Sequence, residues 1–93
     1  MRIGILRVYF QVFDAQSLKE KRQVMRSLKD RLFSQFNVSV AEIGSNDKWQ
    51  AGELAVVTVG NEPRFVRSVM QKVENFIELE SMIRVIEMDI EVI

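Results

Sequence analysis

Hydrophobic and polar residues alternate along the first part of the chain. Gly4, Leu6, Val8, Phe10 and Val12 fall on one side of residues 2–13. A period of two is typical of a β-strand, because successive side chains of a strand point to opposite faces. The pattern therefore predicts a strand with one wholly apolar face and one mixed face, which carries Ile3, Ile5, Arg7, Tyr9, Gln11 and Phe13.

Beyond residue 16 the hydrophobic spacing becomes that of an amphipathic helix. Ser17 and Glu20 stand in the order of a capping box, in which the two side chains accept hydrogen bonds from free backbone N–H groups at the helix start. The helix is predicted over residues 18–36, and its apolar stripe consists of Leu18, Met25, Leu28, Leu32 and Phe36.

The rest of the chain predicts three more strands and a second helix. Residues 37–44 and 53–59 are rich in apolar and β-branched residues, and residues 82–93 alternate again. The second helix is expected to begin with Asn61 as its N-cap and Pro63 in its first turn, where proline loses no hydrogen bond. In the last strand one face is expected to carry Ile86, Met88, Ile90 and Val92, and the other Val85, Glu87, Asp89 and Glu91.

The order of these elements, β-α-β-β-α-β, predicts the fold class. Each strand has only one strongly apolar face, so two helices are expected to cover one face of a four-stranded antiparallel sheet. This is an α+β ferredoxin-like sandwich, in which the first and third strands lie in the centre of the sheet. No linker divides the chain, and residues 1–93 are predicted to form a single ferredoxin-like domain.

The composition narrows the chemistry that the chain can perform. It contains neither cysteine nor histidine, which removes disulfides, thiolate metal sites, a thiol nucleophile and the commonest general base. The 13 Lys and Arg residues balance 13 Asp and Glu residues, so only a local segregation of charge can attract an anionic partner. The chain start lacks the features of a signal peptide, and no apolar run is long enough to span a bilayer. A cytoplasmic protein without membrane contact or cofactor is expected.

Positive charge is concentrated in the first predicted helix. Lys19, Arg22, Arg26 and Lys29 fall within about a quarter of the helix circumference, and Lys21 is expected at the edge of this stripe near the helix start. A helix N-terminus favours anions, so cations there are more readily explained by an anionic partner such as a phosphate group. We interpret the five residues as a nucleic-acid-binding surface. The alternative is a solvated helix face, which is common in proteins that bind nothing anionic.

The second face of the sheet is expected to remain free of helices. Ile3, Ile5, Arg7 and Tyr9 lie on it, and its aliphatic character favours burial against a second copy of the chain, with an ordinary mixed surface as the alternative. Arg7 is placed to meet a carboxylate of the last strand. RNA-recognition motifs stack bases on aromatic residues of this face. The third strand here has none, and the acidic last strand repels phosphate, so an RNA platform is not expected.

Trp49 stands in the polar stretch SNDKWQAG, residues 45–52. An exposed tryptophan would be a stacking or interface residue, and we group it with the interface residues Ile3, Ile5, Arg7 and Tyr9. We expect instead that the ring folds back over the end of the core, because large aromatic residues are usually well buried.

Enzymes that use this fold need residues that the chain lacks. An acylphosphatase-like site requires a glycine-rich phosphate loop after the first strand, and residues 11–18 contain no glycine. A copper-chaperone-like site requires paired cysteines. Glu87, Asp89 and Glu91 share one face of a strand, which is a weak signal for a metal site. The chain is therefore expected not to be an enzyme unless a partner completes a site.

Two motifs resemble those of a bacterial family. SLKEKR, residues 17–22, and FNVSVAE, residues 36–42, are similar to the YlxP-like family of unknown function, and the resemblance extends over essentially the whole chain, Trp49 included. Gly52 departs from the pattern, which leads us to expect a larger residue there. The resemblance implies a ferredoxin-like fold. Genes of this family often lie among those for translation initiation and ribosome maturation factors, which implies a role near RNA or the ribosome.

These patterns lead to one expectation and one alternative. The chain is expected to be a non-enzymatic accessory protein that binds a structured RNA or a ribosomal particle through the basic face of its first helix. The alternative is a homo-oligomeric protein-interaction module that does not bind nucleic acid.

Overall fold

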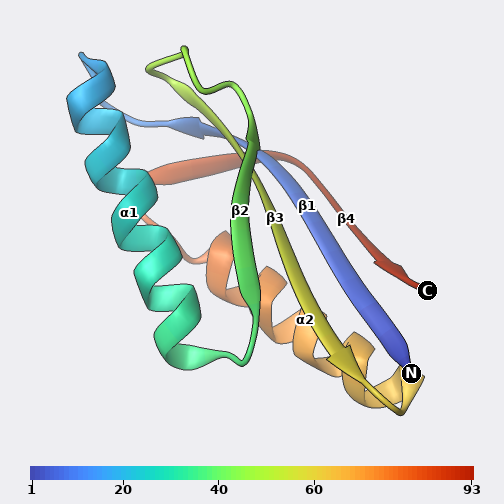
Figure 1. The fold of residues 1–93 in the computed structure, drawn as a ribbon. Helices are drawn as coiled ribbons and strands as arrows, with labels where there is room; N and C mark the ends of the chain where they lie inside the picture. Colours follow the sequence, from blue (N-terminus) through green and yellow to red (C-terminus); the bar gives the residue numbers. More distant parts are fainter.

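The computed structural model describes residues 1–93, and its elements follow the predicted order. The strands are β1 (Arg2–Val12), β2 (Ser39–Gly44), β3 (Ala51–Gly60) and β4 (Ile83–Val92), and the helices are α1 (Leu18–Gln35) and α2 (Pro63–Glu78). The strands form one antiparallel sheet in the order β2-β3-β1-β4 (Figure 1). The predicted ferredoxin-like α+β fold is confirmed, with β1 and β3 in the centre of the sheet.

The core lies between one face of the sheet and both helices. Leu6, Val8, Phe10 and Val12 of β1 are buried there, as the alternation predicts. Burying a side chain of the size of leucine contributes about 1.5–3 kcal/mol, so this row of residues is a main source of stability. The helices complete the core with Val24, Met25, Leu28 and Leu32 from α1 and Met70, Val73 and Ile77 from α2. Neither helix combines the length and the hydrophobicity that crossing a membrane would need.

The two helices begin in different ways. In α1 the Ser17 hydroxyl oxygen accepts a hydrogen bond from the backbone N–H of Glu20 at 3.1 Å, which confirms the predicted cap. The Glu20 carboxylate accepts one from the backbone N–H of Gln16 at 2.6 Å. The prediction for α2 was wrong, because its N-cap is Glu62 rather than Asn61 and no side chain caps it. Pro63 at the first helical position has no N–H group to satisfy and a fixed φ suited to a helix.

A β-bulge in β4 changes which residues face the core. Tyr9 of β1 pairs with Glu87, whereas Phe10 pairs with Val85, so Ile86 is an extra residue between them. An extra residue reverses the alternation of side chains on its two sides. Val85 therefore packs against the core, and Ile86, which is 57% exposed, lies on the open face. The predicted faces of these two residues were wrong, because an uninterrupted alternation was assumed.

Gly52 is required by the packing of the core. β3 begins at Ala51, before the predicted start at Glu53, and Gly52 is buried opposite Phe10 of β1. A Cβ atom at this position would lie 2.7 Å from a ring carbon of Phe10 and 3.0 Å from the sulfur of Met25. The expected larger residue does not fit, because the aromatic ring lies directly against the backbone of β3.

Gly52→Ala is expected to lower the free energy of unfolding by about 1–3 kcal/mol, because the added methyl group overlaps the ring of Phe10. Chemical denaturation measures the loss. Phe10→Leu in the same chain removes the overlapping ring atoms, so the double variant should lose less stability than the sum of the two single losses. Strictly additive losses would show that the Phe10 ring is not what excludes a side chain at residue 52.

Candidate functional site

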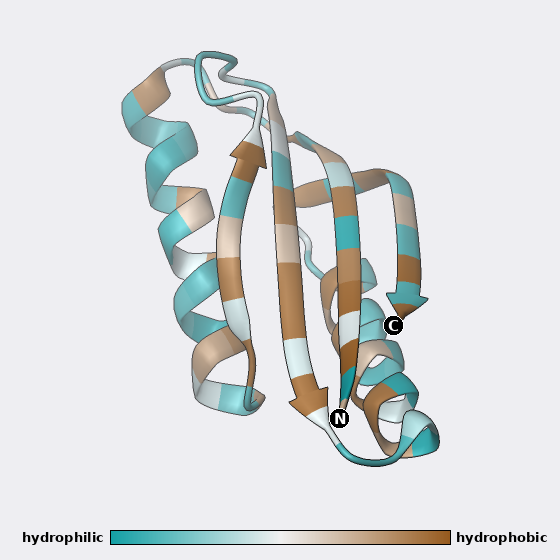
Figure 2. Cartoon of the chain, turned by 45° about the vertical axis from the view of Figure 1, so that its right-hand side comes forward, coloured by the Kyte–Doolittle hydropathy of each residue, from teal (hydrophilic) through white to brown (hydrophobic).

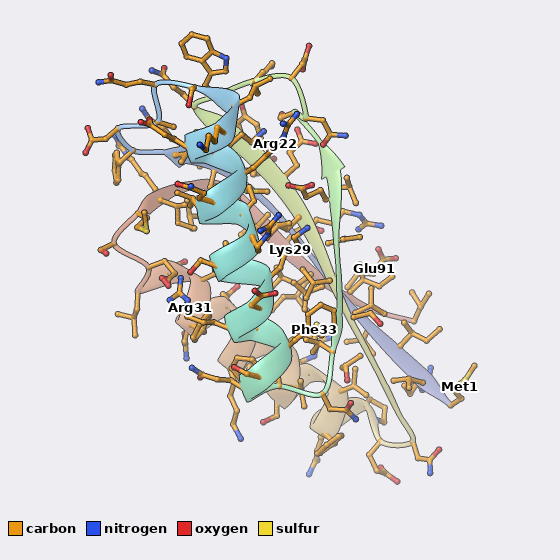
Figure 3. The ribbon with its side chains drawn as sticks, turned by 60° about the vertical axis from the view of Figure 1, so that its left-hand side comes forward. Met1, Arg22, Lys29, Arg31, Phe33 and Glu91 are labelled. Atoms are coloured by element: carbon orange, nitrogen blue, oxygen red, sulfur yellow. The ribbon has the colours of Figure 1, made fainter.

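The basic residues of α1 lie beside the free edge of the sheet. β2 is an edge strand, and a groove of about 430 Å³ separates it from α1. Arg22 and Lys29 project from the side of α1 that faces β2, whereas Arg31 projects from the other side (Figure 3). We call this the α1 groove, and it is lined by Arg22, Met25, Arg26, Lys29, Asp30, Phe33, Val40 and Glu42.

The cations of the α1 groove differ in how far they are neutralised. The ammonium nitrogen of Lys29 lies 3.9 Å from a carboxylate oxygen of Glu42 on β2. Arg22 and Arg26 are exposed and form no ion pair. Lys19 is also exposed and unpaired, although it lies outside the lining of the groove. Within α1, the free positive charge is therefore concentrated in the N-terminal half.

Phe33 adds an aromatic ring that the sequence prediction missed. Its side chain is 53% exposed and projects on the same side of α1 as Arg22 and Lys29 (Figure 3). Phe33 lies outside the apolar stripe of the helix, and its helical spacing from Arg22, Arg26 and Lys29 is the signal that could have found it. Surfaces that bind single-stranded nucleic acid combine cations with exposed aromatic rings in this way.

Lys21 does not belong to the exposed basic surface, so its predicted place at the edge of the stripe was wrong. Its side chain is 3% exposed, and its ammonium group donates a hydrogen bond to the backbone carbonyl of Ser45. Burial lowers the pKa of Lys21, because desolvation disfavours the charged form, while the carboxylates of Glu42 and Asp47 act in the opposite direction. The cation points inward because the Ser45 carbonyl gives it a partner there.

The Lys21 contact joins the start of α1 to the β2–β3 loop, residues 45–50 (Figure 1). Ser45 has a left-handed backbone with φ of 59°, and its carbonyl also accepts a hydrogen bond from the backbone N–H of Lys48 at 3.2 Å. At the other end of the loop, the Gln50 carbonyl accepts one from the backbone N–H of Val12 at 2.8 Å. The loop is therefore attached to the rest of the fold at both ends.

Trp49 lies between these two attachments and does not pack over the core. Its side chain is 49% exposed, and it lines a pocket together with Tyr9 on the open face of the sheet. The prediction that the ring folds back over the core was wrong, because the attachments of the loop place the residue toward the open face.

Apolar residues occur at the ends of β1 and β3 nearest the N-terminus (Figure 2), and some of them lie on the open face. Ile3 pairs with Val59 of β3 and exchanges two backbone hydrogen bonds of 2.9 Å with Ile93. Ile5 pairs with Val57 of β3. Val59 and Ile93 are exposed, and Ile3 and Ile5 are partly exposed. We call these five residues the apolar end of the open face.

Arg7 separates the apolar end from the pocket of Tyr9 and Trp49. Its guanidinium group lies 3.3 Å from a carboxylate oxygen of Glu91 and 3.7 Å from one of Asp89, which confirms the predicted contact with the last strand. No group of three or more acidic residues is arranged to hold a metal ion. The predicted interface residues Ile3, Ile5, Arg7, Tyr9 and Trp49 all border the open face, at different places along it.

Comparison with known proteins identifies relatives but no function. A family model described as a protein of unknown function, DUF503, matches residues 3–90. The uncharacterized protein YlxP of Bacillus subtilis (strain 168) is 36% identical over 76 residues, which are 82% of this chain and 83% of that protein. The family match spans both α1 and the β2–β3 loop.

Lys21→Met tests the buried ammonium group, because methionine keeps most of the side-chain volume and removes the charge. The pKa of Lys21 in the folded chain lies below its ordinary value of 10.5, so the unfolded chain binds more protons as the pH rises toward that value. The stability of the parent should therefore rise relative to Lys21→Met as the pH increases from neutral to about 10.5. Thermal unfolding over this range measures the difference.

Lys19→Met removes the charge of an exposed lysine in the same turn and is the control. Its stability should increase with pH as that of the parent does. A difference between the parent and Lys21→Met that does not change with pH would contradict the buried position of the ammonium group.

Proposed function

The chain belongs to the DUF503 family, and we propose that it is a cytoplasmic, non-enzymatic accessory protein that binds structured RNA or a ribosomal particle through the α1 groove. The family membership predicted from SLKEKR and FNVSVAE is confirmed. One observation carries the proposal. Arg22 and Arg26, without carboxylate partners, lie in one groove with the exposed ring of Phe33, in a chain whose formal net charge is zero.

The spacing of the free cations suits a phosphate backbone. Lys19, Arg22 and Arg26 follow one another at intervals of about one helical turn, which spreads them over roughly 10 Å of the helix axis. Arginine binds phosphate with two parallel hydrogen bonds, and each neutralised phosphate releases condensed counterions. A line of three cations therefore favours an extended anionic chain over a single small anion.

Neighbouring carboxylates limit this binding to the N-terminal half of α1. Glu42 pairs with Lys29, and Asp30 also lines the groove. Few phosphate contacts are then expected, and few contacts give weak binding with a modest salt dependence, because the slope of log K against log salt grows with the number of contacts. An accessory protein that associates and dissociates readily fits such a surface better than a permanent component of a particle does.

A second candidate function is a homo-oligomeric interaction module, supported by the apolar end of the open face. Val59 and Ile93 are more than half exposed, beside Ile3 and Ile5 at the end of the central strand. The same apolar end on a second copy of the chain can pair with it about a twofold axis and remove it from water. This candidate leaves the α1 groove free, so the two functions do not exclude each other.

Arg22→Glu together with Arg26→Glu is expected to weaken the binding of ribosomal RNA at low salt, because two phosphate contacts become repulsive. The slope of log K against log salt should fall by about 1.4–1.8, since each contact contributes about 0.7–0.9. Fluorescence anisotropy at several salt concentrations measures both quantities.

Arg64→Glu together with Arg67→Glu is the matched control, because it makes the same change of charge on exposed residues of α2. The control should keep the slope of the parent. The proposal is wrong if both double variants lose the same affinity, or if the parent shows no salt-sensitive binding.

The second candidate predicts that the chain sediments as a dimer at micromolar concentration. Val59→Arg should shift the sedimentation toward the monomer, because it introduces a charge into the apolar end. Leu79→Arg, at an exposed residue that follows α2, should leave the dimer unchanged. A monomer at every concentration of the parent would rule out this candidate.

A further inference from the structure

A pocket of about 690 Å³ lies at the other end of the open face, beside the β2–β3 loop. The only tryptophan and the only tyrosine of the chain, Trp49 and Tyr9, both line it. Small-molecule and cofactor sites have volumes of about 300–1,000 Å³ and combine aromatic walls with a few polar groups. The volume of this pocket falls in that range, and aromatic and polar side chains both line it.

The two aromatic rings reach the pocket from different elements and do not form a pair with each other. Tyr9 belongs to the central strand β1, and Trp49 belongs to the loop. The aromatic pair of the chain is formed elsewhere, by Phe36 and Phe76, so Tyr9 and Trp49 do not stack on each other. The bulge of β4 adds the exposed side chain of Ile86 to the lining. A planar group can therefore enter between apolar surfaces.

The loop that carries Trp49 is held near both of its ends without a ligand. The buried ammonium group of Lys21 holds the loop at Ser45, and the backbone N–H of Val12 holds it at Gln50. A site whose walls are already in place spends less conformational entropy on binding. These attachments also explain why a large aromatic residue stays half exposed without collapsing onto the core.

We propose that this pocket binds a nucleobase from an unpaired segment of RNA. Stacking on aromatic rings accepts the flat face of any base. The side chains of Gln11, Gln50 and Asp47 line the pocket and supply donors and acceptors for the polar edge of the base. Lys48 also lines it and is suited to the phosphate of the same nucleotide.

The charges around Tyr9 favour a base over a phosphate at this place. Tyr9 pairs with Glu53 on one side and Glu87 on the other, and these carboxylates repel a nucleic-acid backbone laid across the sheet. A base carries no net charge and avoids that repulsion. The acidic residues therefore argue against RNA binding across the middle of the sheet. The β2–β3 loop forms a separate site at one end of the open face.

The loop that borders the pocket also contacts the start of the helix that carries the α1 groove. The β2–β3 loop lies beside the start of α1 (Figure 1), and the contact between Lys21 and Ser45 joins the two directly. A strand with phosphates on Lys19 and Arg22 can pass this loop and insert a base beside Trp49. The inference rests on the proposed function, and it specifies that the RNA bound is unpaired rather than a duplex.

Because Trp49 is the only tryptophan, its fluorescence reports on the pocket directly. The probes are a single-stranded oligoadenylate of about ten nucleotides and a duplex RNA of equal length. The oligoadenylate should change the emission of Trp49, and the duplex should not. Tyr9→Leu should weaken oligoadenylate binding roughly tenfold without changing its salt dependence, because stacking releases no counterions.

Two further variants separate the pocket from the α1 groove. Arg22→Glu with Arg26→Glu should reduce the salt dependence, while saturating oligoadenylate still changes the emission. Trp49→Leu changes a half-exposed loop residue and should also weaken oligoadenylate binding roughly tenfold. Anisotropy with labelled oligoadenylate measures this loss, and it tests the pocket without relying on the folding of Tyr9→Leu.

Equal affinity for both probes with unchanged emission would overturn the pocket and leave the α1 groove standing. An emission change that survives the arginine reversals without any loss of affinity would support the pocket and contradict the proposed function. No binding of either probe would contradict both. An emission that changes with protein concentration but not with RNA would show that a second copy covers the pocket, and would also overturn the inference.

Discussion

Both helices pack on the same face of the four-stranded sheet, and the rest of the structure depends on this arrangement. The apolar row of β1 is buried beneath α1 and α2, so the opposite row remains exposed or must meet a partner. Because α1 lies beside the edge strand β2, one side of the helix packs into the core, and the side that faces β2 borders the α1 groove. Lys21 and Arg22 are consecutive, yet the first is buried and the second is exposed.

The hydrophobic pattern was sufficient to predict the order and placement of the elements, because each strand and helix has one clearly apolar side. It failed where the pattern carries no information. Val85 and Ile86 are both apolar, so a bulge between them leaves no trace in the alternation. The burial of Lys21 depends on a carbonyl of Ser45 that the sequence does not place beside it. Phe33 could have been found, since its helical spacing matches that of the cations.

The charges of the chain are separated in space although they cancel in number. Free cations lie on both helices, on the covered side of the sheet, whereas the open face carries Glu87, Asp89 and Glu91, two of which pair with Arg7. An anionic backbone is therefore favoured on the helix side of the molecule over the open face. In the proposed function, the contact between Lys21 and Ser45 keeps the loop of Trp49 next to the start of α1.

Photocrosslinking of the protein to ribosomal RNA, with the crosslinked peptides identified by mass spectrometry, tests the central claim most directly. The claim is that RNA lies along α1 and reaches the β2–β3 loop. Crosslinks to peptides that contain Phe33 and Trp49, lost at high salt, are the predicted result. Crosslinks confined to α2, or none above those of a protein that does not bind RNA, would contradict it.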